Sequence, residues 1–274
     1  MNKDKRQFLE ETARKIRIGV IEGVYAAGCG HPGGSLSIAD LLAYLYTEEL
    51  KGIDPANPGN PDRDRFVLSK GHTAPAYYAA LAEKGFFPAE ELKTLRKIDS
   101  RLQGHPDMKH IPGVDMTTGS LGLGISAACG MALAGKTAGR NYRVYTIVGD
   151  GESEEGQVWE AAMFAAHYHL SNLCVIVDWN GLQIDGPVAE VMNPTPHDEK
   201  FRAFGFNVIS IDGHSFEDME KAFAAARACT DKPTAIIAET VKGKGVSYME
   251  NQVGWHGKAP KEEEYKKALA ELNA

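Results

Sequence analysis

The chain has 274 residues, of which 43% are hydrophobic and 24% charged, and this globular composition excludes disorder, collagen and a coiled coil. Thirty lysines and arginines against 37 aspartates and glutamates leave a net charge of −7, which argues against a broad nucleic-acid surface but leaves a local basic site open. There is no apolar run of about 18 residues, so we expect no membrane span.

The N-terminus and the cysteines indicate the compartment. The first residues lead into a charged amphipathic stretch without the apolar core of a signal peptide. The four cysteines are far apart and form no C-x-x-C pair, so we interpret them as buried thiols in a reducing cytoplasm. They are Cys29, Cys129, Cys174 and Cys229.

The N-terminal part of the chain has the pattern of helices. Apolar side chains recur at helical spacing over about residues 6–27, and this pattern ends at Gly28. Ser37-x-x-Asp40 predicts an N-cap for a second amphipathic helix over 41–50. Residues 51–64 are rich in Pro, Gly, Asn and Asp, which is typical of a surface loop.

From residue 65 onward, predicted strands alternate with predicted helices. The strands are apolar without alternation, as in a parallel sheet that is covered by helices on both faces. The sequence therefore predicts an α/β fold with a doubly wound, mostly parallel sheet, in a single domain over 1–274. The expected strands are 65–68, 142–148, 173–177, 207–211 and 235–239, and the expected helices are 74–84, 124–136, 152–167 and 216–228.

The Gly/His/Pro-rich stretch 100–123 is too long for a simple connection, and such loops are usually functional. Two nucleotide-binding patterns lie near it. Residues 130–137 (GMALAGKT) match a P-loop letter for letter, but they lie inside a predicted helix and not between a strand and a helix. Residues 122–127 match G-x-G-x-x-A, again without a preceding strand. We reject the P-loop and take the second pattern only as a tight turn into a helix.

Polar residues follow two successive predicted strands. Asp150 stands between two glycines at the end of 142–148, and Asn180 follows 173–177. If these strands are neighbours, both side chains lie at the same edge of the sheet, where such folds bind ligands. Carboxylate, amide and backbone carbonyl oxygens suit Mg²⁺ or Ca²⁺ together with phosphate oxygens. Each residue taken alone would be only a turn or cap residue.

The Gly149-Asp150-Gly151 segment followed by Asn180 resembles the signature of thiamine-diphosphate enzymes. Five further motifs narrow the resemblance to transketolase, and to the diphosphate-binding domain at its N-terminus. They are GHPGG at 30–34, LSKGH at 68–72, GHP at 104–106, TTGSLG at 117–122 and VGWHGKAP at 253–260. The resemblance covers nearly the whole chain. The departures are Ser120, where many relatives have Pro, and Lys70, where others have Asn.

The resemblance implies thiamine diphosphate and Mg²⁺ as cofactors, with Ca²⁺ or Mn²⁺ as alternative metals. It assigns the metal to Asp150, Asn180 and the carbonyl of Leu182. The cofactor-binding residues implied are His72, Gly119, Ser120, Leu121, Asp150, Gly151, Glu152, Asn180 and His256. The catalytic residues implied, which face the substrate, are His31, His105 and His256.

Histidines in Gly/Pro loops suit this chemistry independently of the family, because ketol transfer moves protons to and from sugar hydroxyls near neutral pH. The remaining histidines are interpreted as surface or satisfied core residues. These are His110, His167, His169, His197 and His214. His167-x-His169 has no further partner at zinc spacing. Acidic residues at 152–155 suit a helix N-terminus, although the resemblance also suggests that Glu155 lies near a subunit contact.

A full transketolase continues into pyrimidine-binding and C-terminal domains, and the resemblance therefore implies one half of a split enzyme. We expect a partner subunit that carries the pyrimidine-binding domain, in an α2β2 heterotetramer, with no nucleic acid or membrane partner. The expected reaction moves a glycolaldehyde unit from a ketose phosphate to an aldose phosphate, as in the pentose phosphate pathway. The alternatives are a split enzyme for another ketose, branched or sulfonated, and a cofactor-binding subunit without turnover.

Overall fold

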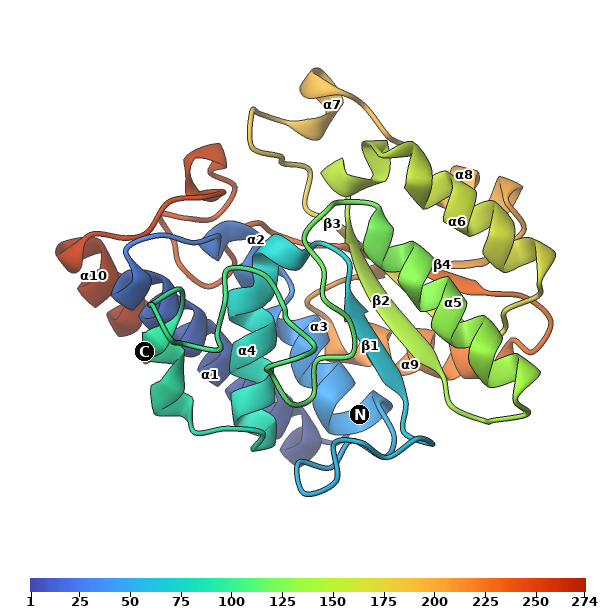
Figure 1. The fold of residues 1–274 in the computed structure, drawn as a ribbon. Coiled ribbons are helices and arrows are strands. Elements are labelled where there is room, and N and C mark those ends of the chain that lie inside the picture. The colour runs from blue at the N-terminus through green and yellow to red at the C-terminus, as the bar shows by residue number, and fades with distance from the viewer.

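The computed structural model describes all residues, 1–274, and contains one five-stranded sheet, which Figure 1 shows with helices on either side. All its strands are parallel, in the order β1-β2-β3-β5-β4. The predicted parallel α/β architecture is therefore confirmed. The strands are β1 (Arg65–Leu68), β2 (Val144–Gly149), β3 (Leu173–Trp179), β4 (Asn207–Asp212) and β5 (Thr234–Glu239).

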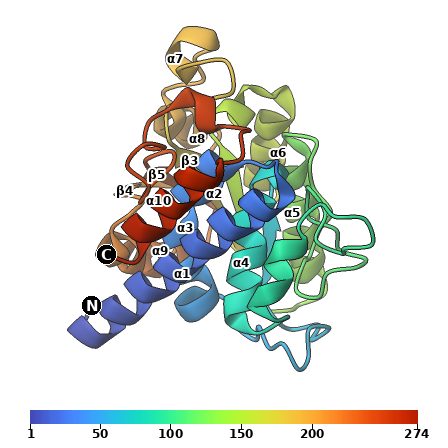
Figure 2. The ribbon, with the colours of Figure 1, turned by 90° about the vertical axis from the view of Figure 1, so that its left-hand side faces the viewer.

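Helices cover both faces of the sheet, and alternate residues of each strand point to opposite cores. On one face, Val67, Val148 and Val175 pack under α5 (Leu123–Thr137), α6 (Gly156–His167) and α8 (His197–Ala203). On the other face, Phe66 and Ile147 join a larger core, which is why these strands have no polar side. The helices of that core are α1 (Lys3–Ala27), α3 (Ala39–Tyr44), α4 (Ala74–Lys84), α9 (Phe216–Ala228) and α10 (Glu262–Leu272). Figure 2 shows α10 lying along α1.

Most predicted elements are present, with shifted ends. The first helix begins at an Asn2 cap, whose side chain accepts from the Lys5 amide at 2.8 Å, and ends at Gly28 with φ +67°. The predicted helix 152–167 is divided into a 3₁₀ turn, η4 (Gly151–Glu154), and α6. Several short elements were not predicted, and they are η2 (Gly71–Thr73), η3 (Ala89–Thr94), α7 (Val188–Val191), α8, η5 (Val253–Trp255) and α10.

The prediction for residues 37–50 is right about a helix but wrong about its cap and its amphipathic character. Ser37 ends a short helix, α2 (Pro32–Ser37), and its hydroxyl lies 2.9 Å from the Gly34 carbonyl and 2.8 Å from Asp178, so it caps nothing. The helix α3 follows at once and continues into a π-helical turn, η1 (Leu45–Glu49). Every residue of α3 is buried, so the segment is not amphipathic.

The structure bears on the predicted burial of the cysteines and on the question of membrane-spanning helices. Cys129 and Cys174 are buried as predicted, whereas Cys29 is exposed and Cys229 half-buried. None of the helices combines the length and the apolar character that crossing a membrane requires.

Candidate functional site

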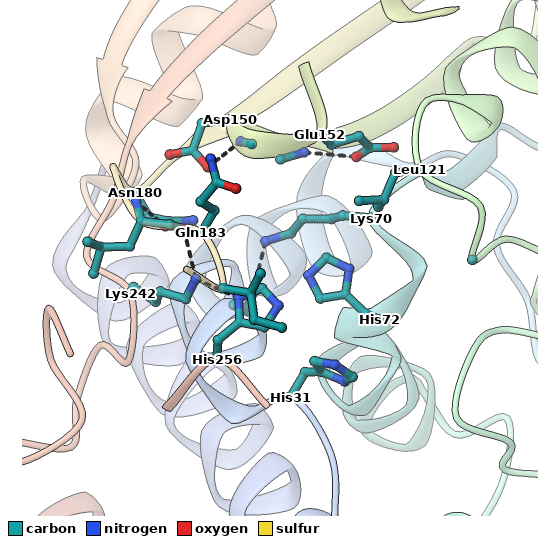
Figure 3. A pocket seen from close by; sticks show the side chains of 16 residues that line it. His31, Lys70, His72, Leu121, Asp150, Glu152, Asn180, Gln183, Lys242 and His256 are labelled. Atoms are coloured by element: carbon teal, nitrogen blue, oxygen red, sulfur yellow. Dashed lines mark hydrogen bonds between the residues drawn. The ribbon is translucent and has the colours of Figure 1, made fainter. Parts of the chain in front are cut away.

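A cavity of about 320 Å³ opens at the carboxyl ends of β2, β3 and β5 (Figure 3). This is the edge at which parallel sheets bind ligands. Only three of its sixteen lining residues are hydrophobic, so it is built for a polar ligand. The lining consists of His31, Gly34, Lys70, His72, Gly119, Leu121, Gly149, Asp150, Gly151, Glu152, Asn180, Leu182, Gln183, Ile184, Lys242 and His256.

Asp150 and Asn180 meet at this edge because β2 and β3 are neighbours, with Gly149 paired to Asp178. One carboxylate oxygen of Asp150 accepts from the Gly151 amide at 2.8 Å, and the other accepts from the Gly181 amide. Burial, reinforced by the charge of Asp178, raises the pKa of Asp150 to about 6. A buried carboxylate of this kind gains from a nearby cation.

Three oxygens at this edge of the sheet suit a metal. They are a carboxylate oxygen of Asp150, the Oδ1 of Asn180 and the backbone carbonyl of Leu182. The Oδ1 of Asn180 accepts from the Leu182 amide at 3.2 Å, and the Leu182 carbonyl accepts from the Lys242 ammonium at 2.8 Å. No group of three or more His, Cys, Asp or Glu side chains is placed to hold a metal ion. One carboxylate with two neutral oxygens fits Mg²⁺, which keeps waters and phosphate oxygens in its shell.

Three histidine rings form one wall of the cavity. The ring centroids of His31, His72 and His256 lie 5.2 to 5.5 Å from one another. Burial lowers the pKa of His31 to about 4 and of His256 to about 3, and lowers that of His72 well below its ordinary value. The rings are therefore neutral near pH 7. The Nδ1 of His31 is buried without a hydrogen-bond partner, which leaves it for a ligand.

Two lysines that sequence reasoning did not assign to the site supply positive charge. Lys70 is 2% exposed and Lys242 is 2% exposed, and both line the cavity. Burial lowers the pKa of Lys242 to about 8. The signal for Lys242 was its place just after β5, whose end lies beside that of β3. The Lys242 ammonium, which has no carboxylate partner, is suited to an anion, whereas the charge of Lys70 is paired with Asp178.

Glu152 joins the glycine loops that frame the cavity. Its carboxylate accepts from the Ser69 hydroxyl at 2.5 Å, from the Gly122 amide at 2.9 Å and from the Gly149 amide at 3.0 Å. Burial raises the pKa of Glu152 in spite of these donors. The side chain therefore holds the frame and does not point at a ligand.

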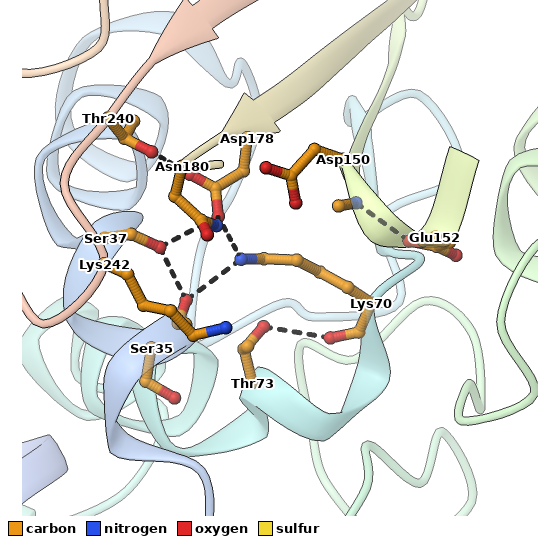
Figure 4. A network of polar contacts seen from close by, with 12 residues as sticks. Ser35, Ser37, Lys70, Thr73, Asp150, Glu152, Asp178, Asn180, Thr240 and Lys242 are labelled. Carbon is orange, nitrogen blue, oxygen red and sulfur yellow. Dashed lines mark hydrogen bonds and ion pairs between the residues drawn. The ribbon is translucent and has the colours of Figure 1, made fainter. Parts of the chain in front are cut away.

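Behind the cavity lies a polar network centred on Asp178, which is fully buried (Figure 4). The carboxylate pairs with the Lys70 ammonium, and it accepts from the Thr240 hydroxyl and from the Asn180 amide nitrogen at 2.8 Å. Burial alone would raise the pKa of Asp178, but Lys70 and the hydrogen bonds outweigh it and keep this pKa below its usual value. Asp178 is therefore a buried carboxylate ion.

The structure places most of the predicted site residues on this cavity, but not all. His105 lies beside Gly119 and outside the lining, where its positive form would lower the pKa of His31. Ser120 also lies outside the lining and borders a neighbouring groove. All the other predicted residues line it, namely His31, His72, Gly119, Leu121, Asp150, Gly151, Glu152, Asn180, Leu182 and His256.

The histidines that were set aside lie elsewhere. His197 is buried, with its ring 2.9 Å from the Ser153 hydroxyl, and His214 lies 2.7 Å from Asp40. Both are satisfied internal residues, as interpreted from the sequence. His110, His167 and His169 are exposed.

Neither nucleotide-binding pattern forms a phosphate loop. Residues 130–137 are part of α5, and Lys136 donates to the carbonyls of Tyr168 and His169. In the second pattern, the amide of Gly122 is already bound to Glu152. The rejection of the P-loop is confirmed.

Comparison with known proteins gives a consistent result. The family described as "Transketolase, thiamine diphosphate binding domain" matches residues 9–273. The chain is 50% identical over 264 residues to the 6-deoxy-6-sulfo-D-fructose transketolase subunit of Clostridium sp. (strain MSTE9), covering 96% of each chain. It is 41% identical to an apulose-4-phosphate transketolase subunit of Phocaeicola vulgatus, covering 97% of this chain and 94% of that protein.

Longer relatives match over part of their length. The chain is 47% identical to rat transketolase over 260 residues, which is 94% of this chain and 41% of the rat protein. Among solved structures, transketolase from Leishmania mexicana superposes with a TM-score of 0.92 at 34% identity, over 97% of this chain and 41% of that one. Transketolase from Campylobacter jejuni gives a TM-score of 0.91 at 35% identity over 100% of this chain and 43% of that one.

Proposed function

The chain belongs to the transketolase family, and from this premise we propose that it is the diphosphate-binding subunit of a two-carbon ketol transferase. The observation that carries the proposal is the cavity itself. It joins three oxygens that suit a metal, two buried lysines and three neutral histidines at the carboxyl edge of the sheet.

The residues present fit thiamine diphosphate and Mg²⁺. Asp150, Asn180 and the Leu182 carbonyl would hold the metal, and Lys242 and His72 would face the diphosphate. The unpartnered Nδ1 of His31 supports a ligand at this wall. The cofactor, when bound, supplies the nucleophilic carbon for breaking the bond between C2 and C3 of a ketose.

The chain itself would handle the protons. Neutral imidazoles can accept a proton from a sugar hydroxyl and return it, and His31 and His256 lie 5.5 Å apart at the cavity wall for this role. His105, at the margin of the cavity, would act on the more remote part of the sugar. Leu121 and Ile184 are apolar members of the wall and would exclude water there.

We infer that turnover needs a partner chain with a pyrimidine-binding domain, in an α2β2 assembly. Two relatives of this chain's length are named as subunits, and the longer relatives extend well beyond the matched part. The donor is a ketose, with a ketose phosphate as the first candidate. A sulfonated or branched ketose is the second, and here 6-deoxy-6-sulfo-D-fructose and apulose 4-phosphate are tested first because the two relatives are named for them.

The test uses the chain, its copurifying partner, thiamine diphosphate and Mg²⁺, with ketose phosphates, a sulfonated ketose and a branched ketose phosphate as donors. We expect transfer of a two-carbon unit to an aldose acceptor from at least one donor. Asp150→Ala should abolish metal-dependent cofactor binding, measured by calorimetry, while the sheet remains folded. A partnered complex that transfers nothing from any donor, although it binds cofactor, would leave only the cofactor-binding role.

A further inference from the structure

We propose that Asp178 is a positioning residue for the metal site, because it fixes which end of the Asn180 side-chain amide faces the metal. This inference rests on the proposed function, since it concerns the metal oxygen assigned there to Asn180. Asp178 itself lies behind the cavity and does not line it (Figure 4).

Hydrogen-bond donors surround the carboxylate of Asp178. The Lys70 ammonium has no acceptor capacity, and it pairs with the Oδ2 of a carboxylate that is fully buried. The Thr240 hydroxyl donates to Oδ1, and the Ser37 hydroxyl lies 2.8 Å from Oδ2. With a cation and hydroxyl donors already in place, Asp178 acts only as an acceptor.

The Asp178 carboxylate determines the orientation of the Asn180 side-chain amide. A side-chain amide has a donor end and an acceptor end, and only the donor end can face an ionised carboxylate. The Nδ2 of Asn180 donates to the Oδ2 of Asp178 at 2.8 Å. The Oδ1 must therefore point the other way, where it accepts from the Leu182 amide at 3.2 Å and keeps a lone pair for a cation.

The same carboxylate also ties together the segments that carry the site. Ser37 ends α2, Lys70 follows β1, Thr240 follows β5, and Asn180 follows β3. Lys70 also donates to the Gly34 carbonyl at 3.0 Å, which brings the glycine turn of α2 against the same cluster. Groups held in this way keep a metal ligand in one orientation, and their removal typically weakens metal binding about ten- to hundredfold.

The experiment compares two variants that both lack the Lys70 charge, Lys70→Met and the double variant Lys70→Met/Asp178→Asn. They differ in the group that faces Asn180, since an asparagine at 178 can accept or donate, and in one negative charge. The orientation of the Asn180 amide in crystals of both variants with Mn²⁺ separates these two effects. Binding of Mn²⁺ to the full chain is measured by electron paramagnetic resonance at saturating thiamine diphosphate, together with the thermal midpoint of each variant.

We expect the double variant to bind Mn²⁺ about ten- to hundredfold more weakly than Lys70→Met. Equal affinities in two folded variants would overturn the role of Asp178 and leave the proposed function intact. If the unmodified chain binds no Mn²⁺ with thiamine diphosphate, the proposed metal site itself fails.

A matched control removes another buried ion pair, Arg63 with Asp115 at the opposite edge of the sheet, in the double variant Arg63→Met/Asp115→Asn. The Mn²⁺ affinity of this control should equal that of the unmodified chain, even where the control is less stable. If the Lys70 variants do not fold, a crystal structure of the unmodified chain with Mn²⁺ and cofactor decides the matter. Asn180 Oδ1 on the metal with Nδ2 on Asp178 supports the inference, and any other orientation of the amide refutes it.

Discussion

The ammonium nitrogen of Lys242 lies 2.8 Å from the carbonyl oxygen of Leu182, the backbone oxygen that we assign to the metal, and 2.9 Å from the Nδ1 of His256. Lys242 thus connects Leu182, at the proposed metal site, to His256 in the histidine wall of the cavity. Because it is buried with a pKa lowered to about 8, it is a poorly solvated cation that gains from an incoming anion.

We therefore predict that Lys242→Met weakens binding of thiamine diphosphate at fixed Mg²⁺ by at least tenfold, since a hydrogen bond to a charged group contributes about 1.5–3 kcal/mol. Calorimetric titration measures this change. Lys244→Met is the matched control, because Lys244 is on the same loop with an exposed side chain 3.9 Å from Glu250. Equal losses in both variants would mean that the loop, and not the Lys242 charge, matters.

The meeting of Asp150 and Asn180 could be predicted from the sequence because both follow apolar strands, and the carboxyl ends of parallel strands share one edge. The prediction needed only that β2 and β3 be neighbours, which they are. Lys242 also follows a strand, and this position was its one signal in the sequence, because the stretch around it has no periodicity.

The roles of Asp178 and Ser37 could not be predicted from the sequence. Asp178 stands inside β3, and its partners come from segments more than 100 residues away in two cases, so no local spacing encodes the contact. Ser37 has the local pattern of a helix cap, but tertiary packing turned its hydroxyl to the buried carboxylate. Local patterns thus predicted the candidate metal oxygens, but not the groups that we propose orient them.

Gly34 leaves the space in front of Lys70 and His72. A Cβ at this position would lie 3.0 Å from the Thr73 methyl carbon, 3.6 Å from the Lys70 ammonium and 3.9 Å from the His72 Nε2. We predict that Gly34→Ala lowers cofactor affinity at least tenfold, because the methyl group occupies ligand space, and that it also lowers the urea midpoint, because the buried Thr73 methyl group must give way. Gly254→Ala, where a Cβ would meet nothing within 4 Å, should change neither property. Unaltered cofactor binding in Gly34→Ala would place the ligand elsewhere in the cavity.

Glu152→Gln should damage both stability and cofactor binding. Both carboxylate oxygens of Glu152 accept hydrogen bonds, so any orientation of a glutamine amide turns its NH₂ group toward a donor, either the Gly149 amide or the pair formed by Ser69 and the Gly122 amide. An unsatisfied buried group costs about 1–3 kcal/mol, and we expect a loss in this range from urea unfolding.

Glu160→Gln serves as the control, because Glu160 is exposed on α6 and should leave stability within about 0.5 kcal/mol of the unmodified chain. A Glu152→Gln protein as stable as the original would show that Glu152 is already protonated at the pH of the measurement.

His197 gives the stability a pH dependence that can be isolated. Its ring is 3% exposed beside the Ser153 hydroxyl, and burial followed by the charge of Lys200 lowers its pKa to about 4. Between the ordinary value of 6.5 and this value, the unfolded chain takes up a proton that the folded chain does not. The free energy of unfolding therefore falls as the pH falls, by about 2 kcal/mol from this one group between pH 7 and about pH 4.5.

His197→Gln can keep a hydrogen bond to Ser153 but does not titrate, so its urea midpoint should change less with pH than that of the unmodified chain. The two curves should converge as the pH is lowered toward 4.5. The quantity compared is the difference between the two chains, because Asp150 affects both in the same way. Its raised pKa lowers the free energy of unfolding as the pH rises toward about 6, opposite to the effect of His197. His167→Gln, at an exposed position, should run parallel to the original chain. If His197→Gln also runs parallel, the His197 ring takes up its proton at the same pH in the folded and in the unfolded chain, and burial does not lower its pKa.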